Sequence, residues 1–176
     1  MTSQRYGIAT YPFDASVTYF IDTNVWFLVY GPASPTDRRV PLYSDAVKRL
    51  RSSGAAVLID AVVVSEFVNA WTRFGFHRRG GRDFKVYRES DAFKPVAQEI
   101  AIALRSILKF ATRIQTPFAN LDLNPVLDDF ERGGADFNDL LIVETCQSRS
   151  CILITDDRDM KTAPVPIITA NALILT

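Results

Sequence analysis

Short apolar segments alternate with longer helical segments along this chain, and this alternation limits the folds open to it more than any other feature. The segments with strand character are Thr18 to Ile21, Ala56 to Ile59, Thr112 to Thr116, Ile152 to Thr155 and Pro166 to Thr169. Most are rich in β-branched or aromatic side chains, the composition of strands that are buried on both faces. Strands that alternate with helices in this way form a parallel sheet covered by helices on both faces. We therefore predict an α/β fold.

Helical periodicity fills the intervals between these strands. The predicted helices cover Val25 to Tyr30, Tyr43 to Ser52, 61 to about Phe74, Lys94 to Ala111, Asn124 to Glu131 and Asp136 to Ser148. Glycines interrupt the pattern between Phe76 and Ser90, so we predict a loop or an irregular excursion there. A chain of 176 residues with 48% hydrophobic content suits one domain over residues 1–176, with a basic loop or helix excursion at about 76–95.

The formal net charge is zero, so overall charge favours neither nucleic acid nor membrane as a partner. The charges are unevenly distributed, with 10 Lys or Arg and 4 acids from Arg73 to Arg113, and 10 acids and 3 Arg from Asp122 to Asp159. This split suits a metal nuclease, but two solvated helix faces would also produce it. The sequence shows no signal-peptide pattern and no apolar run of about 18 residues, so we expect a cytoplasmic protein with no membrane partner.

Carboxylates lie beside the predicted carboxyl ends of strands or on the helices that follow them. They are Asp22, Glu66, Asp136, Asp139, Asp156 and Asp157. The carboxyl ends of parallel strands share one edge of the sheet, so we expect these acids to converge there. Burying an unpaired carboxylate is costly, and Mg²⁺ and Mn²⁺ prefer oxygen ligands, so the pattern predicts a divalent metal site. Taken singly, Asp22 and Asp136 could be helix caps, and Asp156 and Asp157 could be turn residues. An ordinary role fits Glu66 least, because its apolar neighbours place it on or near a buried face.

Other catalytic classes fit the sequence less well. His77 is the single histidine, which excludes a His-rich zinc site and disfavours a catalytic unit that pairs histidine with serine or cysteine. The sequence also lacks the glycine-rich patterns of nucleotide-binding loops and the nucleophile motif of serine hydrolases. Metal-assisted chemistry at the acids therefore remains the leading hypothesis.

Four stretches, taken in order, resemble the PIN-domain family. They are Ile21-Asp22-Thr23-Asn24, Glu66 within a helix, Asp136-Phe137-Asn138-Asp139-Leu140-Leu141-Ile142, and Ile154-Thr155-Asp156-Asp157-Arg158-Asp159-Met160. The resemblance spans about Thr18 to Thr169 and implies a Rossmann-like three-layer α/β/α sandwich. It also implies a Mg²⁺- or Mn²⁺-dependent ribonuclease. Many members are VapC-type toxins, so the resemblance further implies a cognate antitoxin as partner and a homodimer.

The resemblance assigns roles to individual residues. It implies four catalytic acids, which with Asp136 would hold the metal: Asp22, Glu66, Asp139 and Asp157. Asp156 remains a rival to Asp157 for the fourth position. The small polar residues Thr23, Asn24 and Thr155 match those that orient the acids in the family.

A basic stretch that also contains aromatic residues follows Gly75. Its cations are Arg78, Arg79, Arg82, Lys85 and Arg88, and Phe76, Phe84 and Tyr87 lie among them. Cations and stacking rings together bind single-stranded RNA, so the stretch is a candidate RNA contact, although its rings could equally pack on the body or on a second subunit. Two other functions stay open: a non-catalytic PIN-like module that binds RNA or protein, and an RNA-processing nuclease without an antitoxin.

Overall fold

The computed structural model describes residues 4–32, 34, 36–133 and 135–176, and a parallel sheet runs through its centre. Within the described residues the sheet has six strands in the order β1-β6-β5-β2-β3-β4. Their bounds are β1 Arg5–Gly7, β2 Thr18–Ile21, β3 Ala56–Ile59, β4 Thr112–Arg113, β5 Ile152–Ile154 and β6 Ile167–Thr169. Every pairing is parallel, which confirms the predicted sheet.

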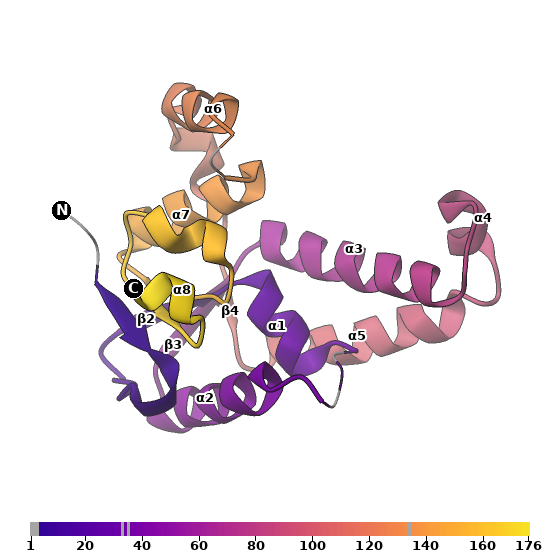
Figure 1. Cartoon of the computed structure of the whole chain (residues 1–176), viewed down its shortest axis with the longest axis horizontal. Helices are drawn as coiled ribbons and strands as arrows, with labels where there is room; N and C mark the ends of the chain where they lie inside the picture. The colour runs from indigo at the N-terminus through magenta and orange to yellow at the C-terminus, as the bar shows by residue number, and fades with distance from the viewer. Residues whose placement is uncertain (1–3, 33, 35, 134) are drawn as a thin grey trace.

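Helices cover this sheet, and Figure 1 shows α2 and α7 on opposite sides of it. The α-helices are α1 Thr23–Tyr30, α2 Arg39–Ser53, α3 Ala61–Arg78, α4 Phe84–Glu89, α5 Lys94–Leu108, α6 Leu123–Glu131, α7 Phe137–Arg149 and α8 Ala172–Leu175. Short 3₁₀ helices are η1 Ile8–Thr10, η2 Pro117–Asn120 and η3 Arg158–Thr162. The fold is thus an α/β sandwich, as the sequence predicted.

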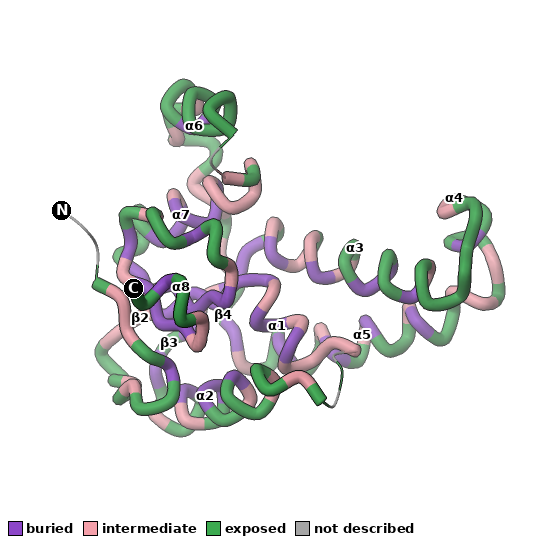
Figure 2. The backbone as a smooth tube through the Cα atoms, viewed as in Figure 1, coloured by how far each residue is buried: buried purple, intermediate pink, exposed green. Residues whose placement is uncertain are grey.

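The core follows the central strands, as the purple segments of Figure 2 show. Tyr19, Phe20 and Ile21 of β2 are fully buried, because β2 lies between β5 and β3 and is covered on both faces. The strand order changes direction at β2, since the chain first continues to β3 and β4 and later returns to β5 and β6. Such a switch point leaves a crevice at the carboxyl ends of the strands, where α/β proteins bind ligands.

A helical arm (residues 74–99) projects from this body, to the right in Figure 1. It consists of the C-terminal end of α3, α4 and the first turns of α5. The prediction of a loop or irregular excursion from Phe76 to Ser90 is therefore wrong for most of that segment, because α3 continues to Arg78 and α4 occupies 84–89. The left-handed backbone of Gly80, with φ of 64°, makes the turn between the two helices.

Gly75 explains why the sequence pattern did not predict that α3 continues past Phe74. It lies inside α3 and not at its end, and a Cβ atom at this position would lie 2.7 Å from the Tyr87 hydroxyl and 3.2 Å from Val96. The glycine therefore lets α3 approach α4 and α5 closely, instead of ending the helix. A glycine within a helix is often kept for such close packing.

Smaller differences concern short elements. The strand β1 and the helix α8 were not predicted, α2 begins at Arg39 instead of Tyr43, and β4 has two residues of the five expected. The single-domain prediction spans residues 1–176, of which 1–3, 33, 35 and 134 lie outside the described residues. Among the helices that the structure describes, none has both the length and the hydropathy needed to cross a membrane.

Candidate functional site

Asp22 lies directly after β2, at the start of α1, and is only 3% exposed. Its Oδ2 atom accepts hydrogen bonds from Thr155 Oγ1 at 2.6 Å and from Asn24 Nδ2 at 2.7 Å. Thr155 reaches Asp22 because β2 and β5 pair in a register that sets Ile21 opposite Ile154. The sheet thus places two polar residues side by side at the carboxyl ends of its central strands.

Glu66 lies in the second turn of α3, and its two carboxylate oxygens are held by two different helices. Thr23 Oγ1 of α1 donates to Oε2 at 2.7 Å, and Asn138 Nδ2 of α7 donates to Oε1 at 2.8 Å. The side chain is half-buried, in keeping with the prediction that it lies near a buried face. These bonds orient the carboxylate toward the carboxyl edge of the sheet and leave lone pairs for further partners.

Helix α7 contributes two acids in different roles. Asp136 is exposed and caps the helix, because its Oδ1 accepts from the Asn138 amide at 2.9 Å. Asp139 is half-buried in the first turn. Burial, and after it the negative charges of Asp22 and Asp157, raise its pKa to about 7.

The acids thus act on one another across the site. The pKa of Asp22 is raised to about 6, mainly by burial and then by the charges of Glu66 and Asp157, against the lowering effect of the Thr155 hydrogen bond. A carboxyl group whose pKa is raised by neighbouring carboxylates lies in an excess of negative charge. A bound cation would relieve that repulsion.

The adjacent acids Asp156 and Asp157 point to different surroundings. Asp156 is 9% exposed, and its carboxylate is bound by Arg39 Nη1 at 2.9 Å and by the Tyr43 hydroxyl at 2.7 Å. Asp157 lines the cleft with the other acids and caps η3 through the Asp159 amide. The geometry favours Asp157 as the fourth acid and gives Asp156 a structural role.

These side chains line an open cleft of about 720 Å³ at the carboxyl edge of the sheet. Its polar lining consists of Asp22, Thr23, Asn24, Arg39, Glu66, Asn69, Arg73, Asp136, Asn138, Asp139 and Asp157. The four predicted catalytic acids, Asp136, Thr23 and Asn24 are therefore brought together. The sequence prediction missed Arg39, Asn69, Arg73 and Asn138, although Asn138 lies inside the motif that carried the resemblance.

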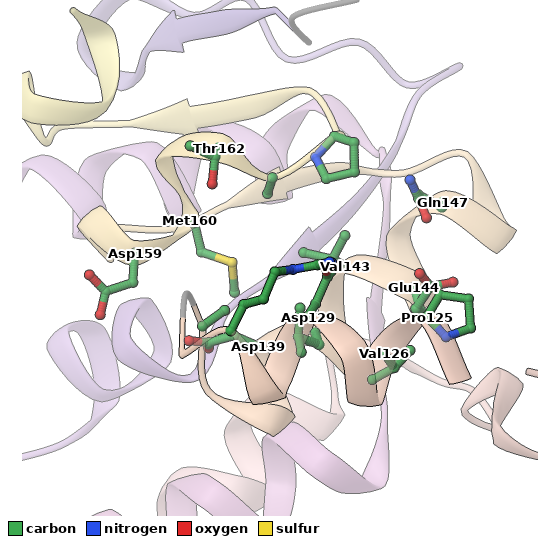
Figure 3. A pocket seen from close by; sticks show the side chains of 15 residues that line it. Pro125, Val126, Asp129, Asp139, Val143, Glu144, Gln147, Asp159, Met160 and Thr162 are labelled. Atoms are coloured by element: carbon green, nitrogen blue, oxygen red, sulfur yellow. The ribbon is translucent and has the colours of Figure 1, made fainter. Parts of the chain in front are cut away.

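A second, smaller hollow of about 280 Å³ lies between α6, α7 and η3 (Figure 3). Asp139 lines both hollows, and Val126, Val143 and Met160 give the second one apolar walls. It has fewer of the predicted acids than the cleft. We therefore place the candidate site in the cleft.

The donor set in the cleft fits a hard divalent cation, since it is made of carboxylates with amide and hydroxyl neighbours. In the described part of the chain, however, no three His, Cys, Asp or Glu side chains are gathered closely enough to hold an ion as they stand. Side-chain rotations within the open cleft would have to bring the oxygens together. The metal role of these residues therefore stays a prediction.

The predicted RNA contacts lie outside this cleft. Arg78 and Arg79 line a separate hollow beside Trp71, Pro95 and Glu99, and Lys85 and Arg88 line another on α4. All five predicted cations, Arg82 included, are exposed. Their aromatic neighbours pack within the arm: Phe76 contacts Phe84 and Tyr87 edge-on or tilted, at ring-centroid distances of 5.4 and 5.7 Å.

Comparison with known proteins assigns the family. The model of the PIN domain matches residues 19–165, which is most of the chain. The chain belongs to the PIN domain family. A search of the curated proteins finds no match.

Two solved structures share the PIN fold. A chain of VapBC2 from Rickettsia felis, solved bound to a DNA fragment from their promoter, is 13% identical with a TM-score of 0.56, over 87% of this chain and 98% of that one. PAE2754 from Pyrobaculum aerophilum is 17% identical with a TM-score of 0.53, over 99% of this chain and 96% of that one. At these identities the likeness shows the fold alone.

Proposed function

We propose that this PIN-domain protein is a Mg²⁺- or Mn²⁺-dependent endoribonuclease that hydrolyses phosphodiester bonds in RNA. One observation carries the proposal: Asp22, Glu66, Asp139 and Asp157 come from four separate segments and line one cleft. Burial and the charges of neighbouring carboxylates raise the pKa of Asp22 and Asp139, a kind of perturbation that gathers at functional sites. Nuclease chemistry at such acids is what the PIN family implies.

In this proposal the chain's own residues hold the reacting groups in place. Asp22, Glu66 and Asp139 would hold the ion, with Asp157 beside them and Asp136 at the rim. When bound, a divalent ion lowers the pKa of water, offsets phosphate charge and stabilises the leaving oxygen. Thr155 and Asn24 fix the Asp22 carboxylate, while Thr23 and Asn138 fix that of Glu66. Such outer partners keep the ligands in productive orientations.

The cellular role is a second part of the proposal. We infer that the chain is the toxin of a type II toxin–antitoxin pair, acts in the cytoplasm, and forms a homodimer. The support is the motif resemblance to VapC-type toxins, together with the fold shared with VapBC2 of Rickettsia felis. An open reading frame for a small DNA-binding protein immediately upstream, whose product binds this chain and blocks cleavage, would support this role.

The catalytic proposal is tested by cleavage of single-stranded and structured RNA with Mg²⁺, with Mn²⁺ and with EDTA. We expect cleavage with either metal, none in EDTA, and a loss on the order of 100-fold in Asp22→Asn and Asp139→Asn. Asp128→Asn is the matched control, because Asp128 is exposed on α6 and does not line the cleft. Activity that survives chelation or either cleft substitution would overturn the proposal.

A further inference from the structure

One face of α3 continues the acidic cleft away from the sheet, and the inference drawn from it rests on the proposed function. Glu66, Asn69, Ala70 and Arg73 line the cleft together. Their spacing of three, four and seven residues places them on one side of an α-helix. The seven residues from Glu66 to Arg73 correspond to a rise of about 10 Å along the helix axis. Arg73 therefore stands about two helical turns beyond Glu66.

Arg73 is also free to bind a ligand. It is exposed and forms no ion pair within the described residues. Arg39, the other cation that lines the cleft, is held by Asp37 and Asp156. Of the two cations that line the cleft within the described residues, Arg73 is thus the one with no acid bound to it.

The cations of the arm are directed elsewhere. Arg78 lies 12 residues after Glu66, which is about 120° around the helix at 3.6 residues per turn. In agreement, Arg78 and Arg79 line the hollow formed with Pro95 and Glu99, on another side of α3. A strand that runs from the acids along this face of α3 therefore meets Arg73 before it can meet the arm cations.

We propose that Arg73 binds a phosphate of single-stranded RNA that flanks the phosphate cut at the acids, so that the bound strand leaves the site along α3. The position of Arg73 outside the acid group suits this task, because a cation there offsets the charge of a neighbouring phosphate without neutralising the acids. In an α-helix the Cα–Cβ bond tilts toward the N-terminus, which for Arg73 is the direction of Glu66, and both residues line the same cleft. Asn69, between Glu66 and Arg73, lies along the same path.

The test measures RNA binding separately from cleavage. Fluorescence anisotropy follows a labelled single-stranded RNA of about twelve nucleotides in EDTA, from about 50 mM to about 200 mM salt. We expect Arg73→Gln to lower affinity roughly three- to tenfold and to reduce the slope of log K against log salt by about 0.7, the value for one lost phosphate contact on a single strand. Arg73→Lys should retain most of the slope, because it keeps the charge.

Arg51→Gln is the matched control, since Arg51 is exposed on α2 and lies outside the cleft. Circular dichroism checks that each variant is folded. If Arg73→Gln and Arg51→Gln have equal affinities and slopes, or if the wild-type protein binds no RNA, the inference is overturned. Cleavage with Mg²⁺ is measured in a separate assay. If wild type and Arg73→Gln cut RNA equally well, only this inference is refuted. A protein that binds through Arg73 but never cuts refutes only the proposed function.

Discussion

Asp156 and Asp157 are neighbours in the chain, yet the structure gives them different tasks. The Asp156 carboxylate accepts hydrogen bonds from Arg39 and Tyr43 in a nearly buried position, while Asp157 lines the cleft. The sequence could not separate them, because both follow the same strand and both suit a turn. The distinction depends on Arg39 and Tyr43, which lie more than a hundred residues earlier.

We expect Asp156→Ala to destabilise the protein by about 1.5–3 kcal/mol, since it leaves the buried Tyr43 hydroxyl with one partner fewer and removes a charged acceptor. The ion pair with Arg39 adds little, because the Arg39 side chain is 54% exposed. Asp157→Ala should cost less, about 1 kcal/mol or below, because it removes only the cap of a short, mostly exposed 3₁₀ helix, and it should abolish cleavage. Urea unfolding and the RNA assay measure both effects. Equal losses of stability in the two variants would contradict this division of roles.

The crowded acids also predict how the metal-free protein responds to pH. The pKa values of Asp22 and Asp139 in the folded state, about 6 and about 7, lie above the ordinary value of 3.8. Between about pH 4 and pH 7 the folded state therefore binds more protons than the unfolded state, and its stability falls as the pH rises. In EDTA we expect Tm to decrease across this window by a few degrees.

Asp139→Asn should raise Tm at pH 7 in EDTA, because it removes one of the repelling charges, and should reduce the slope of Tm against pH. Asp128→Asn serves as the control, since it removes an exposed charge outside the cleft. Addition of Mg²⁺ should raise the Tm of the wild-type protein more than that of Asp139→Asn. Differential scanning fluorimetry gives all of these values, and a Tm that rises with pH in EDTA would refute the argument.

At the scale of elements, α3 connects the site to the arm, and Gly75 determines how the arm packs. We expect Gly75→Ala to destabilise the protein by about 1–3 kcal/mol, because the added methyl group would overlap the Tyr87 hydroxyl and crowd Val96. Alanine's higher helix propensity would offset less than about 1 kcal/mol of this. Thermal or urea unfolding measures the loss.

The Tyr87 hydroxyl is buried and has no hydrogen-bond partner among the described residues. Tyr87→Phe should therefore be neutral or stabilising, and it should recover part of the loss in Gly75→Ala by removing the atom that the new methyl group meets. A double-mutant cycle of unfolding free energies tests this coupling. Strictly additive effects would show that the two groups do not meet.

The same elements show what a sequence pattern can and cannot predict. The central strands and the helices that carry the acids were predicted because their apolar periodicity reflects burial within the sheet and against the helices that cover it. An excursion at about 76–95 was predicted, but the continuation of α3 to Arg78 and the helix α4 were missed, because the reason for Gly75 lies in α4 and α5, and not in its neighbours along the chain. Arg39 and Arg73 were missed for a similar reason, since the importance of a surface arginine depends on which cleft it faces.

For the whole molecule, the sheet and its projections should differ in local stability. The residues of β2 are buried between two paired strands, whereas the turn of the arm at 79–83 and most of α6 are exposed. We expect the amides of β2 and β5 to exchange with deuterium last and those of 79–83 and 127–133 first. Hydrogen exchange followed by mass spectrometry tests this order. Equal protection of the arm turn and β2 would contradict it.

The order of the strands also bears on how the protein is made. Asp22 is held by Thr155, which follows it by 133 positions, and β2 completes its pairing only when β5 joins the sheet. A chain emerging from the ribosome exposes Asp22 early but lacks Asp139 and Asp157 until much later in synthesis. If the protein cuts RNA, an unfinished chain cannot assemble the cleft. The nascent protein would thus be unable to cut the RNA of the ribosome that translates it until β5 and β6 have joined the sheet.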